Sequence, residues 1–290
     1  MEAPLPQSRL AYLGPGIIAA VSFALADVFG KVVLINGADV LTLSTFRSLV
    51  TVAFMAIWLK IDKPPVPHTP RQRWIALGVG LLFCGIVFGL FKAIQLMPVP
   101  ITILSYFVYP LATGLIGAGL GLDNITWRGM TAAVVAFFGL ALTIGAEPKG
   151  IVLGGMALVA GAACCRVGIL LFTRALLHGA DARLNTWYSF ITTGVVFSAI
   201  SLGTWNWNAP QTTWGWFAFI VVTLATISAV LSLFVSITRM GPFRSALIMN
   251  LEPLLATILS VPLLGEVLTP LQALGGAIML GALVAFQLKR

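Results

Sequence analysis

The same stretch of sequence occurs twice in this chain of 290 residues, and the two copies begin 143 residues apart. The first copy runs over residues 91–126 and the second over residues 234–269. Apolar segments match by composition alone, so a repeated proline within the segment and a repeated acidic turn carry most of the weight. Aligned without a gap, the copies share Phe91, Ile94, Met97, Leu104, Pro110, Leu111, Leu120 and Thr126 with Phe234, Ile237, Met240, Leu247, Pro253, Leu254, Leu263 and Thr269, and Asp123 meets Glu266.

Composition limits what these two copies can build. Hydrophobic residues make up 59% of the chain, charged residues only 9%, and the mean hydropathy is +1.01. These values lie outside the range of soluble domains and inside that of polytopic membrane proteins. The net charge of +8 could suggest nucleic acid as a partner. The basic residues are scattered singly at the ends of apolar runs, however, where they act as topology signals, and no nucleic-acid-binding motif is found.

Ten segments are long and apolar enough to span a bilayer, which needs about 20 such residues. The sequence therefore predicts an all-α polytopic membrane protein with ten transmembrane helices. The first segment lacks a small-residue cleavage site, so we expect it to be retained and not to be a signal peptide. The predicted spans are 12–34, 39–60, 74–96, 98–120, 127–145, 150–177, 182–203, 213–238, 243–264 and 267–288.

The two copies divide the chain into halves of five spans each, residues 10–146 and 150–288. Because five is an odd number, the halves enter the bilayer from opposite sides. Inverted repeats of this kind are the usual construction of secondary transporters.

Lysine and arginine counts predict the orientation. With both termini in the cytoplasm, most of the 17 basic residues fall on that side, and only Lys31, Lys92 and Lys149 fall on the other. This asymmetry predicts cytoplasmic N- and C-termini by the positive-inside rule.

No catalytic motif is recognisable, so we expect no enzymatic activity, no cofactor and no metal. Cys84, Cys164 and Cys165 all fall within predicted spans, and we expect them to pack as small apolar residues. His68 and His178 fall in cytoplasmic connections, where we expect solvated surface positions.

Charges within predicted spans are the strongest functional signal, because they are costly in hydrocarbon. Arg166 lies midway along the sixth span and Glu252 midway along the ninth, directly before Pro253. Pro110 and Tyr109 hold the matching positions in the fourth span. Two broken helices facing each other would form a central site with an aromatic wall and a carboxylate. The structural alternative is that Arg166 and Glu252 merely neutralise each other.

Other polar positions add weaker predictions. Asp27 and Arg47 have matching depths in the first two spans, and they form either a permanent tie or an outer gate. Tyr106 lies one helical turn before Tyr109 and extends the aromatic wall. Ser228 and Ser232 belong to a hydroxyl stripe on the eighth span, which lines a path or serves helix packing.

At this point a resemblance can be stated. The segments PVPITILSYFVYPL and GPFRSALIMNLEPLLATILSVPLLGEVLT, and above all the pattern LxPLLATILSxxLLGExLT within the second, resemble the EamA-type family of the drug/metabolite transporter superfamily. The first copy departs from that pattern, with Leu122-Asp123 where Gly-Glu is usual. The resemblance covers the whole chain and implies a multi-pass exporter of small metabolites, often amino acids, in the bacterial inner membrane.

The resulting hypothesis is alternating access around a central cavity, in which Glu252 receives the ammonium of an amino acid and Arg166 its carboxylate. Aromatic and other amino acids rank first, because the tyrosines offer an aromatic wall. A multidrug or quaternary-cation exporter is the alternative, although Arg166 weighs against it. A membrane scaffold without transport is the third reading. Proton coupling and a homodimer both stay open.

Overall fold

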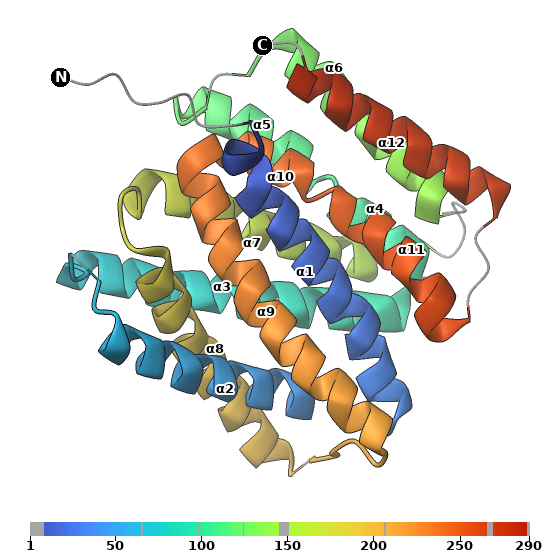
Figure 1. Ribbon diagram of the computed structural model, residues 1–290. Coiled ribbons are helices and arrows are strands. Elements are labelled where there is room, and N and C mark those ends of the chain that lie inside the picture. Colours follow the sequence, from blue (N-terminus) through green and yellow to red (C-terminus); the bar gives the residue numbers. More distant parts are fainter. Residues whose placement is uncertain are drawn as a thin grey trace.

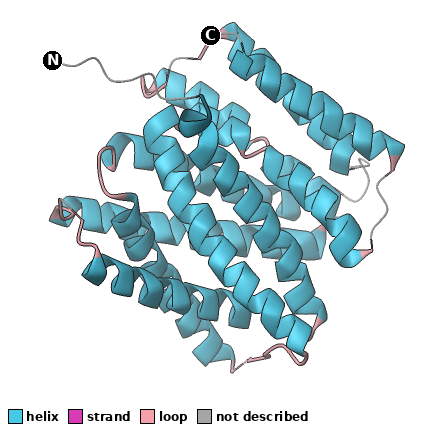
Figure 2. Ribbon diagram, in the orientation of Figure 1, coloured by secondary structure: helices cyan, strands magenta, loops and turns pink. Residues whose placement is uncertain are grey.

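The computed structural model describes residues 9–64, 66–97, 99–123, 125–144, 151–205, 207–265 and 269–288. These residues form helices and no strand (Figure 2). In chain order the helices are α1 (Arg9–Ile35), α2 (Val40–Ile61), α3 (Pro70–Leu96), α4 (Val99–Tyr106), α5 (Tyr109–Gly119), α6 (Trp127–Ile144), α7 (Leu153–Leu176), α8 (Ala182–Thr204), α9 (Thr213–Met240), α10 (Pro242–Ile248), α11 (Leu251–Leu264) and α12 (Pro270–Leu288).

The helices follow the predicted spans closely. The short helices α4 and α5 share one predicted span, and α10 and α11 share another. Eight stretches of the described residues are long and apolar enough to cross a membrane. The two predicted spans outside this set are α8, which buries the polar residues Asn185, Ser189 and Ser201, and α12, whose apolar stretch is shorter.

Side-chain caps fix where several helices begin. The Thr69 hydroxyl accepts a hydrogen bond from the Gln72 amide at 3.2 Å, and the Gln72 side chain accepts one from the Thr69 amide at 2.9 Å. This capping box starts α3 at Pro70, four residues before the predicted span. Thr212, which lies 143 residues after Thr69, caps α9 in the same way by accepting from the Gly215 amide. The repeat therefore extends to the helix caps.

The connections gather in two layers at opposite ends of the bundle. In one layer the α1–α2 turn meets the α8–α9 connection, where the Gln211 amide donates to the Asn36 carbonyl at 2.9 Å. In the other, the α2–α3 connection meets the start of α8, and the Asp123 carboxylate accepts from the Phe243 amide at 3.0 Å. Helix α8 reaches both layers. The helices thus cross one common slab in alternating directions.

Helix packing is related by an approximate twofold exchange of the two halves. Helix α1 packs along α9, and the equivalent pair, α7 and α3, packs in the same way. Helix α2 packs on its own counterpart α8, and α6 packs on its counterpart α12 as a separate pair at the edge of the bundle (Figure 1). Gly139 of α6 and Gly275 of α12 touch backbone to backbone, because neither carries a side chain.

Both predicted helix breaks occur directly before a proline. Helix α4 ends at Tyr106 and α5 begins at Tyr109, with Pro110 in its first turn. Helix α10 ends at Ile248, and α11 begins at Leu251, with Pro253 in its first turn. Proline is tolerated there because the first amides of a helix have no partner within it.

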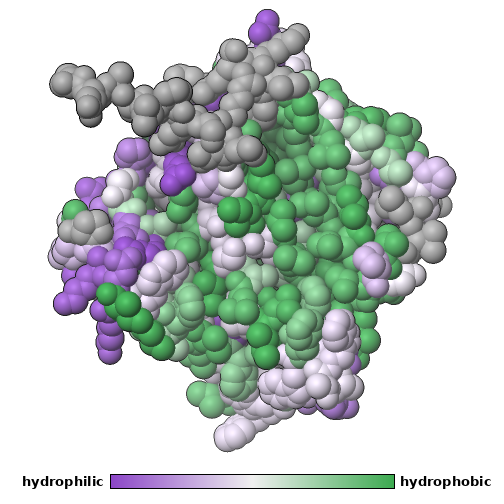
Figure 3. All heavy atoms as spheres, viewed as in Figure 1, coloured by the Kyte–Doolittle hydropathy of each residue, from purple (hydrophilic) through white to green (hydrophobic). Residues whose placement is uncertain are grey.

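The surface matches a membrane position. Large apolar side chains cover the face formed by α1, α9 and α11, while hydrophilic residues gather where α2 ends and α3 begins (Figure 3). Trp205 and Trp216, in and beside the α8–α9 connection, are exposed, as expected for an interfacial aromatic belt.

Candidate functional site

A cavity of about 210 Å³ lies in the centre of the bundle, between helices of both halves. It lies nearer the layer that holds the α1–α2 turn, because α2 contributes its first half and α3 its second. Its lining is Phe23, Ala26, Asp27, Arg47, Ser48, Phe83, Ile86, Val87, Leu90, Tyr106, Arg166, Phe190, Thr193, Phe197, Thr226, Val230 and Glu252.

Four charged side chains from four helices meet at this cavity. Asp27 comes from α1, Arg47 from α2, Arg166 from α7 and Glu252 from α11. The two pairs that the sequence suggested separately therefore belong to one site. When all four are ionised, their charges balance, which makes the site suited to a ligand that carries both signs.

Arg166 is only 5% exposed and lies between two aromatic rings. Its guanidinium carbon is 5.2 Å from the centre of the Phe23 ring and 5.5 Å from that of Tyr109. Cation–π contacts of this kind hold a guanidinium in place without occupying its N–H donors. The Nε atom of Arg166 has no hydrogen-bond partner, so a donor is available for a ligand.

The carboxyl groups of Asp27 and Glu252 are hydrogen-bonded to each other. Arg47 exerts its attraction mainly on Asp27, and Arg166 acts on both carboxyl groups. This contact was not expected from sequence, which paired Asp27 with Arg47 alone. It forms because α1 packs against α11.

The two predicted tyrosines lie at different depths. Tyr106 lines the cavity, whereas Tyr109 is 1% exposed and lies behind it, with the ring centres 5.3 Å apart. The buried Tyr109 hydroxyl has no hydrogen-bond partner. Only one tyrosine is therefore in the cavity wall, and the aromatic surface comes more from Phe23, Phe83 and Phe190.

The serine stripe of α9 lies outside the cavity lining. The Ser228 hydroxyl is 3.0 Å from that of Ser22 on α1, a contact between packed helices, and Ser232 is half-buried. The stripe faces α1 because α1 and α9 pack along their length. A different hydroxyl of α9, that of Thr226, lines the cavity and has no partner there.

Residues that sequence reasoning missed stand at the repeat spacing from the charged ones. Phe23 and Arg166 are 143 residues apart, as are Arg47 and Phe190. Tyr109 and Glu252 have the same separation. At each such pair, one half contributes a charge and the other an aromatic ring. The repeat offset was the signal that could have found Phe23 and Phe190.

Comparison with known proteins decides the family. The model of the EamA-like transporter family matches this chain twice, over residues 12–145 and 153–286. The chain belongs to the EamA-like transporter family. The resemblance noted in the sequence is thereby confirmed, and this EamA-family chain is a multi-pass membrane protein with two EamA repeats.

Individual relatives cover most of this EamA-family chain. The threonine/homoserine exporter RhtA of Escherichia coli (strain K12) is 29% identical over 82% of this chain and 76% of its own length. RhtA of Salmonella typhimurium (strain LT2) is 30% identical, over 78% and 73%. The uncharacterized transporter sll1319 of Synechocystis is 25% identical, over 75% and 68%. A solved structure described as "Crystal structure of protein" superposes with a TM-score of 0.80 at 17% identity, over 96% and 98%, and shares the fold.

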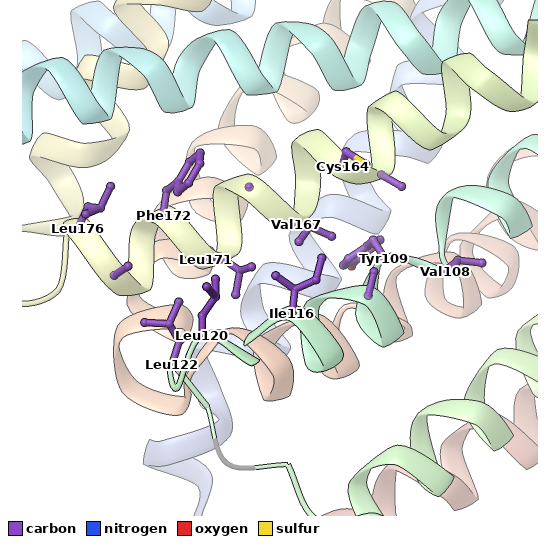
Figure 4. Close-up of a pocket in the computed structure, with 14 residues that line it drawn as sticks. Val108, Tyr109, Ile116, Leu120, Leu122, Cys164, Val167, Leu171, Phe172 and Leu176 are labelled. Carbon is purple, nitrogen blue, oxygen red and sulfur yellow. The ribbon is translucent and has the colours of Figure 1, made fainter. Parts of the chain in front are cut away.

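A second hollow of the EamA-family chain lies between α5 and α7 and has a volume of about 470 Å³. Tyr109 separates it from the central cavity, and its walls are apolar, with Ile116 facing Val167 and Leu171 (Figure 4). Cys164 is exposed on this groove, so the expectation that it packs inside the protein is wrong, whereas Cys84 is buried.

On the other side of the central cavity, α3 and α8 close the bundle. A methyl group on Gly80 would lie 2.3 Å from the Ser189 carbonyl oxygen, and the Ser189 hydroxyl donates to the Ala76 carbonyl at 3.0 Å. The two backbones are therefore in direct contact. This seam lies toward the layer that contains the α2–α3 connection.

The prediction of a solvated His68 is wrong. Its side chain is 4% exposed, its Nε2 atom lies 2.7 Å from Oδ1 of Asn185, and its ring stacks on Tyr188. Burial lowers the pKa of His68 below its ordinary value. The α2–α3 connection folds back over the start of α8, which sequence spacing does not reveal. His178 is exposed, as expected.

Proposed function

We propose that this EamA-family chain exports small zwitterionic metabolites, with amino acids as the substrate class, by alternating access through the central cavity. The observation that carries the proposal is the meeting of Arg47, Arg166, Asp27 and Glu252 in one cavity. A zwitterion presents one cation and one anion a few bonds apart. A cavity that offers paired arginines and paired carboxyl groups matches both.

In this proposal the carboxylate of the substrate binds Arg166, whose Nε is unpartnered, and Thr226 adds a hydroxyl. The ammonium is bound by Glu252 and Asp27. Tyr106 and the phenylalanines of the lining surround the side chain. Tyr109 supports Arg166 from behind.

Small amino acids rank above aromatic ones in this proposal. A cavity of about 210 Å³ corresponds to roughly seven water molecules of liquid volume. That volume suits a side chain such as that of threonine better than an indole. The relatives named threonine/homoserine exporters agree with this ranking, and they also motivate export as the direction.

The proposed architecture is ten membrane spans in two inverted halves, residues 10–146 and 150–288, with both termini in the cytoplasm. Contacts of α8 with both connection layers support its crossing of the bilayer. In this orientation the α3–α8 seam closes the cytoplasmic side and the cavity faces outward. Rocking of the halves around the broken helices α4–α5 and α10–α11 would expose the cavity to the other side.

The test is efflux from liposomes loaded with a mixture of amino acids and a quaternary ammonium compound, with the external medium analysed by mass spectrometry. We expect selective efflux of small amino acids. Glu252→Gln should lower this efflux by about tenfold or more, because it removes a charge-assisted hydrogen bond worth about 1.5–3 kcal/mol.

Two outcomes would contradict the proposal. Efflux of the quaternary cation that improves in Arg166→Ala would identify a cation exporter, because the arginine repels such substrates. Absence of efflux for every solute, from protein that remains monodisperse, would favour a membrane scaffold. Phe88→Leu is the matched control, because Phe88 is 58% exposed on the outer surface of α3.

A further inference from the structure

Contact between two carboxyl groups in a cavity that binds a zwitterion has a chemical consequence. Ionised carboxylates accept hydrogen bonds and cannot donate them. The hydrogen bond between Asp27 and Glu252 therefore contains one proton, shared by the pair. Two carboxyl groups that share a proton titrate as one unit.

The surroundings of the pair come from several helices. Arg47 of α2 and Arg166 of α7 contribute positive charge, and Tyr106 of α4 and Tyr109 of α5 are the other titratable groups acting with them. The parts of α3, α8 and α9 that line the cavity add apolar residues and threonine hydroxyls. Asp27 is exposed to the cavity, so a proton released from the pair reaches water directly.

Independent features of the cavity indicate that a ligand completes it. Arg166 is 5% exposed and Thr226 is 6% exposed, and each has a polar atom without a partner. Buried polar atoms in native proteins are nearly always hydrogen-bonded. In the empty site the cavity thus holds unused donors together with a carboxyl pair that is satisfied only by its proton.

We propose that the Asp27–Glu252 pair holds one proton in the empty site and releases it when the ammonium of the substrate binds between the two carboxylates. This inference rests on the proposed export of amino acids and adds its coupling. The only bond broken is the O–H bond of the pair, and the proton passes to water in the cavity. Each exported amino acid is then exchanged for one proton that enters.

Charge accounting gives this exchange an electrical signature. The empty site contains two arginines and a carboxyl pair of charge −1. The loaded site contains the same arginines, both carboxylates and a neutral zwitterion. Because the returning empty carrier contains one more positive charge than the loaded one, an interior-negative potential should accelerate net export.

The experiment uses the full chain in liposomes loaded with L-threonine and a trapped pH-sensitive dye. Exchange of labelled against unlabelled threonine at equal pH tests recognition of the amino acid without net proton movement. Net threonine efflux should acidify the lumen by one proton per threonine. Asp27→Asn should raise the threonine concentration needed for exchange and reduce the ratio of protons to threonine at least tenfold. Lys31→Gln, one helical turn away and outside the cavity lining, should leave the ratio at one.

The outcomes separate the two proposals. Exchange together with net efflux that moves no protons would overturn the coupling and leave amino-acid export standing. Absence of exchange for every amino acid tested would overturn export itself. A further measurement on the unmodified chain needs no variant to fold: infrared difference spectra should show a protonated carboxyl band that disappears on adding threonine. A band that is absent, or that threonine does not change, would refute the shared proton.

Discussion

Arg166 and Phe23 occupy equivalent positions in the two halves, 143 residues apart, and the guanidinium carbon of one lies 5.2 Å from the ring centre of the other. Residues that a perfect twofold would make identical thus face each other as a cation and a ring. The fold repeats, while the chemistry of the cavity does not. A substrate with two different ends can therefore be held in one orientation.

The first prediction concerns this contact. Phe23→Leu keeps an apolar side chain but removes the ring face, so the cation–π contribution of about 0.5–2 kcal/mol is lost. The apparent KM for amino-acid efflux should rise by about 2- to 30-fold. Efflux at a series of internal concentrations measures it. An unchanged KM, with Phe88→Leu as control, would mean that Phe23 does not position the arginine.

Arg47 allows the two readings of the sequence to be separated. If Arg47 is a permanent tie for Asp27, Arg47→Gln should lower the unfolding temperature strongly, because a buried charge loses its partner. We expect instead a loss of amino-acid efflux of about tenfold or more with a small change in unfolding temperature, because Arg47 lines the cavity. Measuring both quantities on the same preparation distinguishes a binding role from a structural one.

Local signals explain how much the sequence could predict. Hydropathy sets the spans to within a few residues, and Pro110 and Pro253 mark the helix breaks because proline removes a backbone donor. Thr69 shows the limit even for boundaries, since its capping box extends α3 by a turn into a polar stretch.

Contacts between distant helices could not be predicted in this way. Asp27 and Glu252 meet because α1 packs on α11, and no property of either segment alone encodes that pairing. Ser228 lies on an apparent polar stripe, but α1 covers it. His68 is buried because a connection folds back over α8. In each case tertiary packing decides the environment of the side chain.

Gly80 provides a test of the α3–α8 seam. A methyl group there would meet the Ser189 carbonyl oxygen at 2.3 Å, so Gly80→Ala should force the two helices apart at a cost of about 1–3 kcal/mol. The unfolding temperature should fall, and a cysteine placed at Ser189 should become reactive to a water-soluble thiol reagent. Gly78→Ala is the matched control, because a methyl group on Gly78 meets no atom within 4 Å. Equal behaviour of the two variants would exclude a tight seam.

The last prediction is a pH dependence of the connection between α2 and α3. Burial lowers the pKa of His68 below its ordinary value of 6.5, so the unfolded chain binds this proton more readily than the folded one. The contribution of His68 to stability is therefore complete above about pH 6.5 and is lost as the pH falls from there toward the lowered pKa. Asn185, Asp181 and Arg73 surround the ring, and Asp181 moderates the effect by favouring the charged form. His68→Gln should flatten the decline in unfolding temperature between about pH 7.5 and 5.5, whereas His178→Gln, at an exposed position nearby, should leave it unchanged. An identical decline in both variants would show that another group causes it.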